Sequence, residues 1–379
     1  MVGGVDIASL ETVPLDIDVL KIELNSLRNK QAEYKKASSF CKSIKNDLIK
    51  SDIAELLSKR WNKPLEEVKE YLKVDAQTAD EQLAMADDVT KAFEKFQEYY
   101  KSGTSNLGFK SIDESLGGIR NTDVIGLAGY SNHGKSFIAI KIATYRLVRE
   151  KNNVLFFTQE MPTGQVMQYI CQEILHMNER KFFEHIKTEQ GKEDLLKIKE
   201  VLGDRLRVIE ESGKTMDDVA AMTATLNNSG WHVDFTVYDN FQLIPGVGDF
   251  PKYEEQATKM KRYCNQYKCP LLMLVQMNDG FQQRGSKDIR PPVPGDIKGS
   301  NAFMSALDEL LMIWRPSLMQ VNIDALTAEE EKYITMMKIG KARRSINGPS
   351  MFRYKYDPDS YSLHEVPLVA SISKGVKNG

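Results

Sequence analysis

Residues 129–136 read Gly-Tyr-Ser-Asn-His-Gly-Lys-Ser, and this stretch decides the fold. It fits the pattern G-x-x-x-x-G-K-[ST] at every fixed position, after an apolar run at 123–128 and before a helical pattern at 135–150. In such a loop the glycines let backbone N–H groups face phosphate oxygens, and the helix N-terminus adds its dipole. Lys135 then reaches the β- and γ-phosphates, and the Ser136 hydroxyl ligates Mg²⁺. The stretch therefore predicts a nucleotide site.

The other interpretation of this stretch is a glycine turn with a chance lysine. Background composition produces the pattern by accident in roughly one chain in a hundred of this length. The flanking strand and helix favour nucleotide binding, and His133 is expected to fill space in the loop rather than to act in catalysis. The predicted nucleotide-binding residues are Gly129, Ser131, Asn132, His133, Gly134, Lys135, Ser136 and Phe137.

Apolar runs alternate with helical patterns after residue 107. Several runs are continuous, as strands buried on both faces require. The alternation predicts an α/β domain with a mainly parallel sheet flanked by helices. The last runs have short connections, so we expect that edge to turn antiparallel. Strands are expected at 123–128, 154–158, 206–209, 233–239, 271–276, 309–314, 334–339 and 351–356, and helices at 135–150, 163–175, 193–202, 216–227 and 253–267.

Three polar residues each end one of these apolar runs, at the edge of the sheet where ligands bind. A carboxylate such as Glu160 can activate water for attack on the γ-phosphate. Asp239 suits the second Mg²⁺ anchor of a P-loop ATPase, and Gln276 either senses the γ-phosphate or satisfies buried backbone. Each is weak evidence alone, because charged and polar residues are common at strand ends. Their recurrence on consecutive strands predicts a catalytic edge.

The motifs together resemble the RecA-like ATPase domain of DnaB-type replicative helicases. That family carries segments of the types S-L-E-M-P, D-Y-L-Q-L and S-Q-L-N-R. This chain has Thr-Gln-Glu-Met-Pro at 158–162, Asp-Asn-Phe-Gln-Leu at 239–243 and Val-Gln-Met-Asn at 275–278. The family's opening segment, G-[FY]-x-x-L-D, is matched by Gly-Phe-Lys-Ser-Ile-Asp at 108–113. The resemblance covers about residues 107–360, and a short chain of this type is typical of bacteriophages.

The resemblance implies a ring-shaped homohexamer that hydrolyses ATP with Mg²⁺ between its subunits, translocates on single-stranded DNA and unwinds duplex ahead. It implies that Glu160 is the catalytic base, that Asp239 holds the Mg²⁺ with Ser136, and that Gln276 couples the γ-phosphate to the DNA loops. A primase or a helicase loader is the implied protein partner. The implied location is the cytoplasm, the host's if the chain is viral.

The family also supplies an Arg and a Lys in trans from a K-x-R segment, matched here by Lys341 and Arg343. An Arg that reaches a neighbour's γ-phosphate stabilises charge in the transition state. This chain departs from the family because Arg344, Ser345 and Ile346 separate that segment from Asn-Gly-Pro at 347–349. Either Arg343 or Arg344 fits the role, and the spacing from Lys341 favours Arg343.

Two glycine-bearing segments, 282–287 and 294–301, are candidates for DNA-binding loops. Residues 294–301 resemble the family's D-L-R-E-S-G segment, with Lys298 for Arg and Gly299 for Glu, and the other interpretation of this segment is a helix cap. Small residues and backbone N–H groups suit a loop that follows phosphates. A basic strip from 332 to 356 has seven Lys or Arg and no Asp or Glu. The predicted DNA-binding residues are Arg284, Lys287, Lys298, Gly299, Ser300 and Asn301.

The chain before residue 102 has a different composition, rich in Lys, Glu, Leu and Ala. It predicts a small helical domain at 1–80, then a linker helix and linker at 81–106, the ATPase domain at 107–366 and a tail at 367–379. A small helical bundle is favoured over a helix-turn-helix DNA reader at 51–73. The linker helix carries an apolar stripe that docks on the same chain or on a neighbouring subunit, and the sequence favours the same chain. The stripe residues are Val89, Ala92, Phe93, Phe96 and Tyr100.

Composition sets outer limits on the function. The 51 Lys and Arg against 53 Asp and Glu give a net charge of −2, which excludes a wholly basic nucleic-acid coat. The four cysteines lack zinc-site spacing and are expected to be free thiols in a reducing compartment. No apolar run is long enough to predict a membrane span. Two other functions share the P-loop: a RecA-like recombinase or strand-annealing filament, and an assembly protein held together by ATP.

Overall fold

The computed structural model describes residues 24–25, 30–43, 47–70, 72, 89–101, 103–245, 250–278, 291–297, 300–319, 332–344 and 346–368. The chain divides into two units, Met1–Lys101 and Ser102–Gly379. Among the described residues, no helix is both long and apolar enough to cross a membrane.

The first unit is helical. Helices α2 (Lys30–Ser43) and α3 (Asp47–Trp61) share a small core with the helical residues 65–70. Its buried apolar side chains are Leu24, Ala37, Cys41, Ile53, Ala54, Leu57, Trp61 and Val68. Helix α5 (Val89–Lys101) carries the predicted apolar stripe, and the stripe residues Val89, Phe93 and Phe96 are exposed.

The second unit is built on one nine-stranded sheet with the order β3-β2-β4-β5-β1-β6-β7-β8-β9. The six strands from β3 through β6 in this spatial order are parallel. Strand β7 pairs antiparallel with β6, β8 with β7, and β9 with β8. The predicted α/β class and the antiparallel edge are confirmed. The strands are β1 Val124–Gly129, β2 Val154–Thr158, β3 Leu206–Glu210, β4 Phe235–Asp239, β5 Leu271–Gln276, β6 Glu309–Trp314, β7 Ile334–Ala342, β8 Met351–Asp357 and β9 Ser362–Val366.

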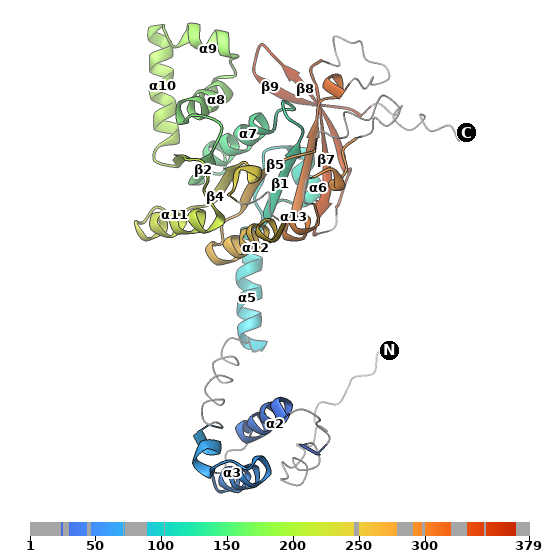
Figure 1. Ribbon diagram of the computed structural model, residues 1–379. Coiled ribbons are helices and arrows are strands. Elements are labelled where there is room, and N and C mark those ends of the chain that lie inside the picture. Colours follow the sequence, from blue (N-terminus) through green and yellow to red (C-terminus); the bar gives the residue numbers. More distant parts are fainter. Residues whose placement is uncertain are drawn as a thin grey trace, which may run out of the picture. The chain divides into compact units, whose positions relative to one another are not determined.

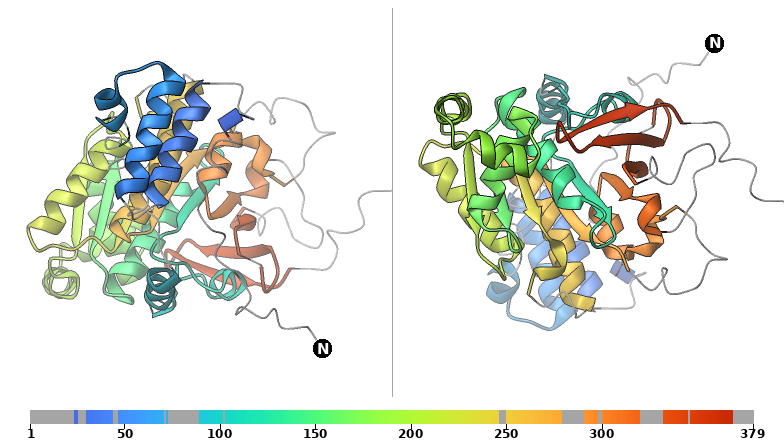
Figure 2. Two further views of the ribbon diagram at one scale, coloured as in Figure 1. Left: turned by 90° about the horizontal axis from the view of Figure 1, so that it is seen from below. Right: turned by 90° about the horizontal axis from the view of Figure 1, so that it is seen from above.

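Helices cover both faces of this sheet (Figure 1). On one face, helices α7 (Lys135–Val148), α8 (Thr163–Leu175) and α10 (Glu189–Leu202) pack with Ile125 and Leu127 of β1. On the other, α11 (Met216–Asn228), α12 (Phe250–Tyr267) and α13 (Ser300–Ala306) pack with the alternate residues Val124 and Ala128. The view from above in Figure 2 shows α7 and α8 in front of the sheet. A central strand buried on both faces explains the continuous apolar run in the sequence.

Several elements were not predicted. The missed helices are α6 (Lys110–Leu116), α9 (Glu179–His185) and α13, and each is only seven residues long. Seven residues make about two turns, too few for a long apolar stripe in the sequence. Helix α9 has a side-chain cap, in which Asn178 accepts from Lys181 N, whereas α6 has none. Strand β9 has few apolar residues because it lies at the sheet edge. Strand β7 runs three residues further than predicted, so Lys341 lies within it.

A buried charge cluster lies at the amino edge of the parallel strands. Arg344 donates to Asp123 Oδ2 at 2.7 Å and to Glu309 Oε1 at 3.1 Å. Asp308 accepts from Val124 N at 2.9 Å and pairs with Lys261 at 2.6 Å. Burial raises the pKa of Glu309 to about 8, and the Arg344 charge opposes that shift only in part. The cluster therefore joins the base of β1 to β6 and the end of β7.

We predict that Glu309 makes stability depend on pH. Its folded pKa of about 8 lies above the ordinary value of 4.5, so the folded state holds a proton that the unfolded chain releases between these values. Wild-type stability should therefore fall, relative to Glu309→Gln, as pH rises from about 5 to about 8.5, measured by urea unfolding. Identical pH slopes in the two proteins would show that Glu309 is ionised in the fold.

Candidate nucleotide site

The phosphate-loop motif connects β1 to α7, as the sequence predicts. Gly134 caps α7 with φ 93°, a left-handed conformation that a side chain would strain. A Cβ on Gly129 would lie 2.8 Å from Ile313 Cγ1, so only glycine lets this strand end pass its neighbour β6. The backbone thus requires glycine at both ends of the loop, independently of any ligand.

Lys135 and Ser136 begin the helix and face different partners. Lys135 Nζ donates to the carbonyl oxygens of Gly129 and Tyr130, each at 3.0 Å. Ser136 Oγ donates to Asp239 Oδ2 at 2.8 Å. The fold therefore brings together a hydroxyl and a carboxylate that follow different strands, as the predicted Mg²⁺ pair requires.

Asp239 is 1% exposed, and burial raises its pKa to about 6 while the Ser136 hydrogen bond opposes the shift. A hydroxyl and a buried carboxylate are hard oxygen donors of the kind that suits Mg²⁺, which keeps most of its ligands as water and phosphate oxygen. Among the described residues, no three His, Cys, Asp or Glu side chains converge into a protein-only metal site. The donor set fits a metal that arrives with a nucleotide.

Glu160 and Gln276 lie at the same carboxyl edge. Glu160 Oε1 accepts from Asn240 Nδ2 at 2.7 Å, and Asn240 directly follows Asp239. Gln276 ends β5, beside β1, with its backbone held by the side chain of Gln242. The predicted residues Lys135, Ser136, Glu160, Asp239 and Gln276 are therefore gathered on adjacent strand ends.

The sequence reasoning missed a cavity beside the loop. Its volume is about 270 Å³. It is lined by residues of the phosphate loop, the start of α7, the start of β7 and the ends of β6 and β8. Arg315 follows β6 directly. A polar residue at the end of an apolar run, the pattern that pointed to Glu160, therefore marks Arg315 as well. The lining residues are His133, Gly134, Phe137, Ile138, Arg315, Tyr333, Thr335 and Tyr356.

His133 is part of the loop's framework. It is 2% exposed, and its Nδ1 accepts the backbone N–H of Arg315 at 2.9 Å. Burial and the positive charges of Lys135 and Arg315 lower its pKa to about 4. The neutral ring thus ties the phosphate loop to the end of β6, which fits the space-filling role expected of it.

Lys341 and Arg343 lie at the opposite edge of the sheet. Strand β7 is antiparallel to β6, so it ends beside the amino ends of the parallel strands, where Arg343 N donates to Asp308 O at 2.7 Å. Lys341 Nζ donates to the carbonyls of Leu307, at 2.7 Å, and Met304. Neither side chain therefore reaches the phosphate loop of its own chain.

Arg343 and Arg344 differ in their surroundings. The Arg344 side chain is 27% exposed and bridges the buried carboxylates Asp123 and Glu309. The Arg343 side chain is 52% exposed and pairs with Asp308 at 3.2 Å. Arg344 thus binds acidic side chains in the domain's interior, while about half of the Arg343 side chain is exposed to solvent.

The predicted DNA-binding residues are only partly described. Arg284, Lys287, Lys298 and Gly299 lie outside the described residues. Ser300 and Asn301 are in the first turn of α13, and only their backbone is described. The basic strip maps to β7, β8 and their connection, where Lys341, Arg344 and the buried Arg353 serve the domain's own structure.

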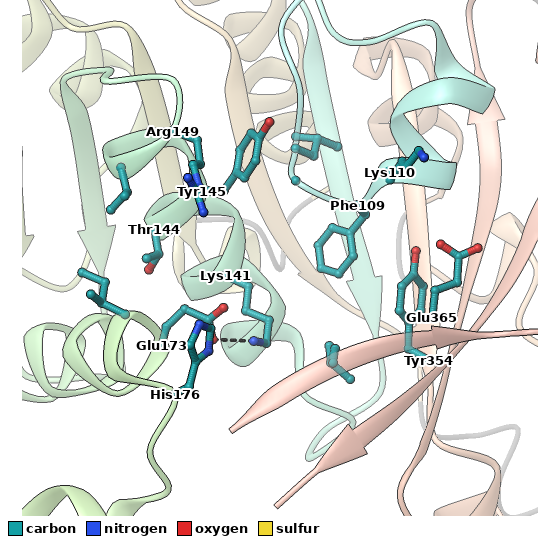
Figure 3. A pocket seen from close by; sticks show the side chains of 15 residues that line it. Phe109, Lys110, Lys141, Thr144, Tyr145, Arg149, Glu173, His176, Tyr354 and Glu365 are labelled. Atoms are coloured by element: carbon teal, nitrogen blue, oxygen red, sulfur yellow. Dashed lines mark hydrogen bonds and ion pairs between the residues drawn. The ribbon is translucent and has the colours of Figure 1, made fainter. Parts of the chain in front are cut away.

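A larger cavity of about 410 Å³ lies beside α7, away from the phosphate loop. Figure 3 shows Lys141 of α7 pointing at Glu173 of α8, with Phe109 and Tyr354 on the other side of the cavity. Lys141 also lies over the Phe137 ring at 4.9 Å, and burial lowers its pKa. The buried ion pair ties α7 to α8 and so fixes the helix that carries the loop.

Known proteins resemble the second unit in sequence. A family profile described as the DnaB-like helicase C terminal domain matches residues 105–361. The replicative DNA helicase DnaB of Haemophilus influenzae is 26% identical over 253 residues, 64% of this chain and 51% of that protein. The DnaB of Geobacillus stearothermophilus is 26% identical over 255 residues, 64% of this chain and 52% of that protein. The chain therefore spans about half the length of the curated relatives it matches.

Two solved structures share the fold. One, described as an ATPase domain, aligns with a TM-score of 0.62 and 16% identity, over 74% of this chain and 100% of that one. The other is a DnaB-like replicative helicase, described together with its interactions with primase. It aligns with a TM-score of 0.57 and 16% identity, over 91% of this chain and 82% of that one. These likenesses confirm the RecA-like ATPase fold that the motifs predicted. Because the family profile covers well over half of its residues, the chain belongs to the DnaB-like helicase C-terminal domain family.

Proposed function

We propose that this chain is an ATP-driven, ring-forming DNA helicase that translocates on single-stranded DNA, with ATP hydrolysed at its subunit interfaces. The observation that carries the proposal is the division of the catalytic set between two opposite edges of one sheet. The Ser136–Asp239 pair and Glu160 lie at the carboxyl edge, and Arg343 lies at the amino edge. A complete site then needs two copies of the chain.

The residues of the carboxyl edge divide the work of hydrolysis among them. Backbone N–H groups of the loop and Lys135 hold the phosphates, while Ser136 and Asp239 hold the Mg²⁺. The metal, when bound, neutralises charge on the β- and γ-phosphate oxygens. Glu160 takes the proton of the attacking water, and its exposed position leaves room for that water. The cavity lined by Arg315 and Tyr356 takes the nucleoside.

We propose that the segments after β5 contact the DNA strand, that the first unit binds a primase or loader, and that residues 81–106 link it to the ATPase domain. The support is the family membership and, for primase, the interactions described for one structural relative. The ring is a hexamer in this proposal, and it works in the cytoplasm.

We predict that Glu160→Gln abolishes DNA-stimulated ATP hydrolysis. Loss of a general base lowers the rate by about 10²–10⁴-fold. Nucleotide affinity should stay close to wild type, because the phosphate contacts come from other residues. Lys135→Ala is the comparison variant, which loses nucleotide binding as well. A wild-type rate that ignores single-stranded DNA would instead favour the assembly protein held by ATP.

We predict that Tyr356→Ala weakens ATP binding by about tenfold, the scale of one lost aromatic stacking contact with a base. The turnover at saturating ATP should change little, since Tyr356 is near the end of β8 and five strands separate β8 from β2, the strand that precedes Glu160. Competition by inorganic tripolyphosphate, which has no nucleoside, should be the same for wild type and variant. Equal losses for both ligands would show that the cavity does not hold the nucleoside.

We predict that the two adjacent arginines differ in what their loss affects: ATP hydrolysis for Arg343 and stability for Arg344. Arg343→Ala should lower hydrolysis by about 10³-fold or more, as loss of an arginine finger does. Its melting temperature should fall less than that of Arg344→Ala, because Asp308 keeps its pair with Lys261. Arg344→Ala should lower the free energy of unfolding by about 3–5 kcal/mol, because it leaves the buried carboxylate of Asp123 without its cation.

Mixing subunits tests whether Arg343 acts in trans. Arg343→Ala has an intact phosphate loop, and Lys135→Ala has an intact Arg343. Rings that contain both should therefore recover part of the wild-type hydrolysis. Mixed rings with no recovery would contradict a shared site.

A further inference from the structure

The catalytic glutamate is held by a residue that the family pattern does not contain. Asn240 is 4% exposed, and its Nδ2 donates to Glu160 Oε1 at 2.7 Å. The D-Y-L-Q-L segment has a Tyr at this position. The Asn240 amide carries its donor and its acceptor on separate atoms, which a phenol does not, so the two contacts of this side chain depend on an amide here.

The oxygen of the Asn240 amide is linked to strand β5 through Gln242. Its Oδ1 accepts from Gln242 N at 3.1 Å. Gln242 in turn uses both ends of its side chain on one residue of β5, because Oε1 accepts from Gln276 N at 3.0 Å and Nε2 donates to Gln276 O at 3.1 Å. Each amide has a donor partner on one side and an acceptor on the other, so only one orientation of each satisfies both.

The residues after β5 form hydrogen bonds with the phosphate loop and with residues 296–297. Met277 N donates to Gly129 O at 3.1 Å, which anchors the strand end to the phosphate loop. Met277 also bridges to Ile297, and Asn278 N donates to Asp296 O at 2.9 Å. These bonds join the two ends of the stretch 279–295, which contains the predicted DNA-binding residues Arg284 and Lys287 in its sequence.

We propose that Asn240 is a positioning residue that couples DNA binding to Glu160 through the hydrogen-bonded relay Glu160–Asn240–Gln242–Gln276. The proposal rests on the proposed function, with Glu160 as the base. The amide fixes Oε1 and leaves Oε2 to accept the proton of water. A shift of the β5 end on DNA binding passes through Gln242 to Asn240 and reorients the carboxylate.

The test uses the full chain with ATP, Mg²⁺ and an oligothymidine strand, and measures kcat and KM with and without DNA. Asn240→Asp keeps the acceptor for Gln242 N and replaces the donor to Glu160, while Asn240→Ala removes both. Asn178→Asp is the matched control, because Asn178 also accepts from a cap N–H (Lys181 N, 2.9 Å) and donates its Nδ2 to a distant carbonyl (Pro358 O, 3.0 Å).

Both Asn240 variants should lose DNA stimulation, with kcat in the presence of DNA falling at least about tenfold, the scale of one hydrogen bond to a charged group. KM should stay within about twofold, and the control should keep the wild-type ratio. Gln242→Leu breaks the relay without touching Asn240 and should lose stimulation as well. In combination with Asn240→Ala it should cause no further loss, because both interrupt one relay.

Two results would each overturn the relay. One is an unchanged stimulation ratio, including an equal fall of kcat with and without DNA, and the other is additive losses in the double variant. Melting temperatures and affinity for a non-hydrolysable ATP analogue separate these results from misfolding, and Gln242→Leu keeps the test open if an Asn240 variant does not fold. The proposed function fails separately, if wild type is not stimulated by DNA or Glu160→Gln still hydrolyses ATP.

Discussion

The hydrogen bond between Ser136 Oγ and Asp239 Oδ2 is the contact on which the nucleotide site depends. It forms because parallel strands β1 and β4 present their carboxyl ends at one edge, with β5 between them. The sheet thus sets the separation of the two side chains, and helices packed on both faces hold the sheet. Burial keeps Asp239 in a low-dielectric setting, where its charge is favoured only when a cation or hydrogen-bond donor faces it.

The same sheet explains why, in the proposed mechanism, one chain does not complete the site. Strand β7 reverses direction after β6, so the residues at its end lie at the edge opposite the phosphate loop. The cluster of Asp123, Asp308, Glu309 and Arg344 stiffens that edge. Arg343 lies next to this cluster, which suits the arginine finger that we propose, because a fixed backbone limits the side-chain freedom lost on contact with a nucleotide.

Much of this architecture was predictable from the sequence. Apolar runs located eight of the strands, and the signal was strongest for the central strands, because strands buried on both faces read as continuous apolar runs. The phosphate loop, Glu160, Asp239 and Gln276 follow from their places after those strands. The cavity wall was not predictable, since Tyr333 and Tyr356 come from antiparallel strands whose pairing is set by long-range contacts. The Asn240 contact was also hidden, because its partner lies 80 residues away along the chain.

The central claim is that ATP is hydrolysed at a site shared between two copies of the chain. The most direct measurement is the rate of ATP hydrolysis per subunit, with saturating single-stranded DNA, as the protein is diluted. The account predicts that this rate falls steeply once rings dissociate, because each phosphate loop then lacks its neighbour's Arg343. A rate per subunit that stays constant while sedimentation shows the rings giving way to single chains would contradict it.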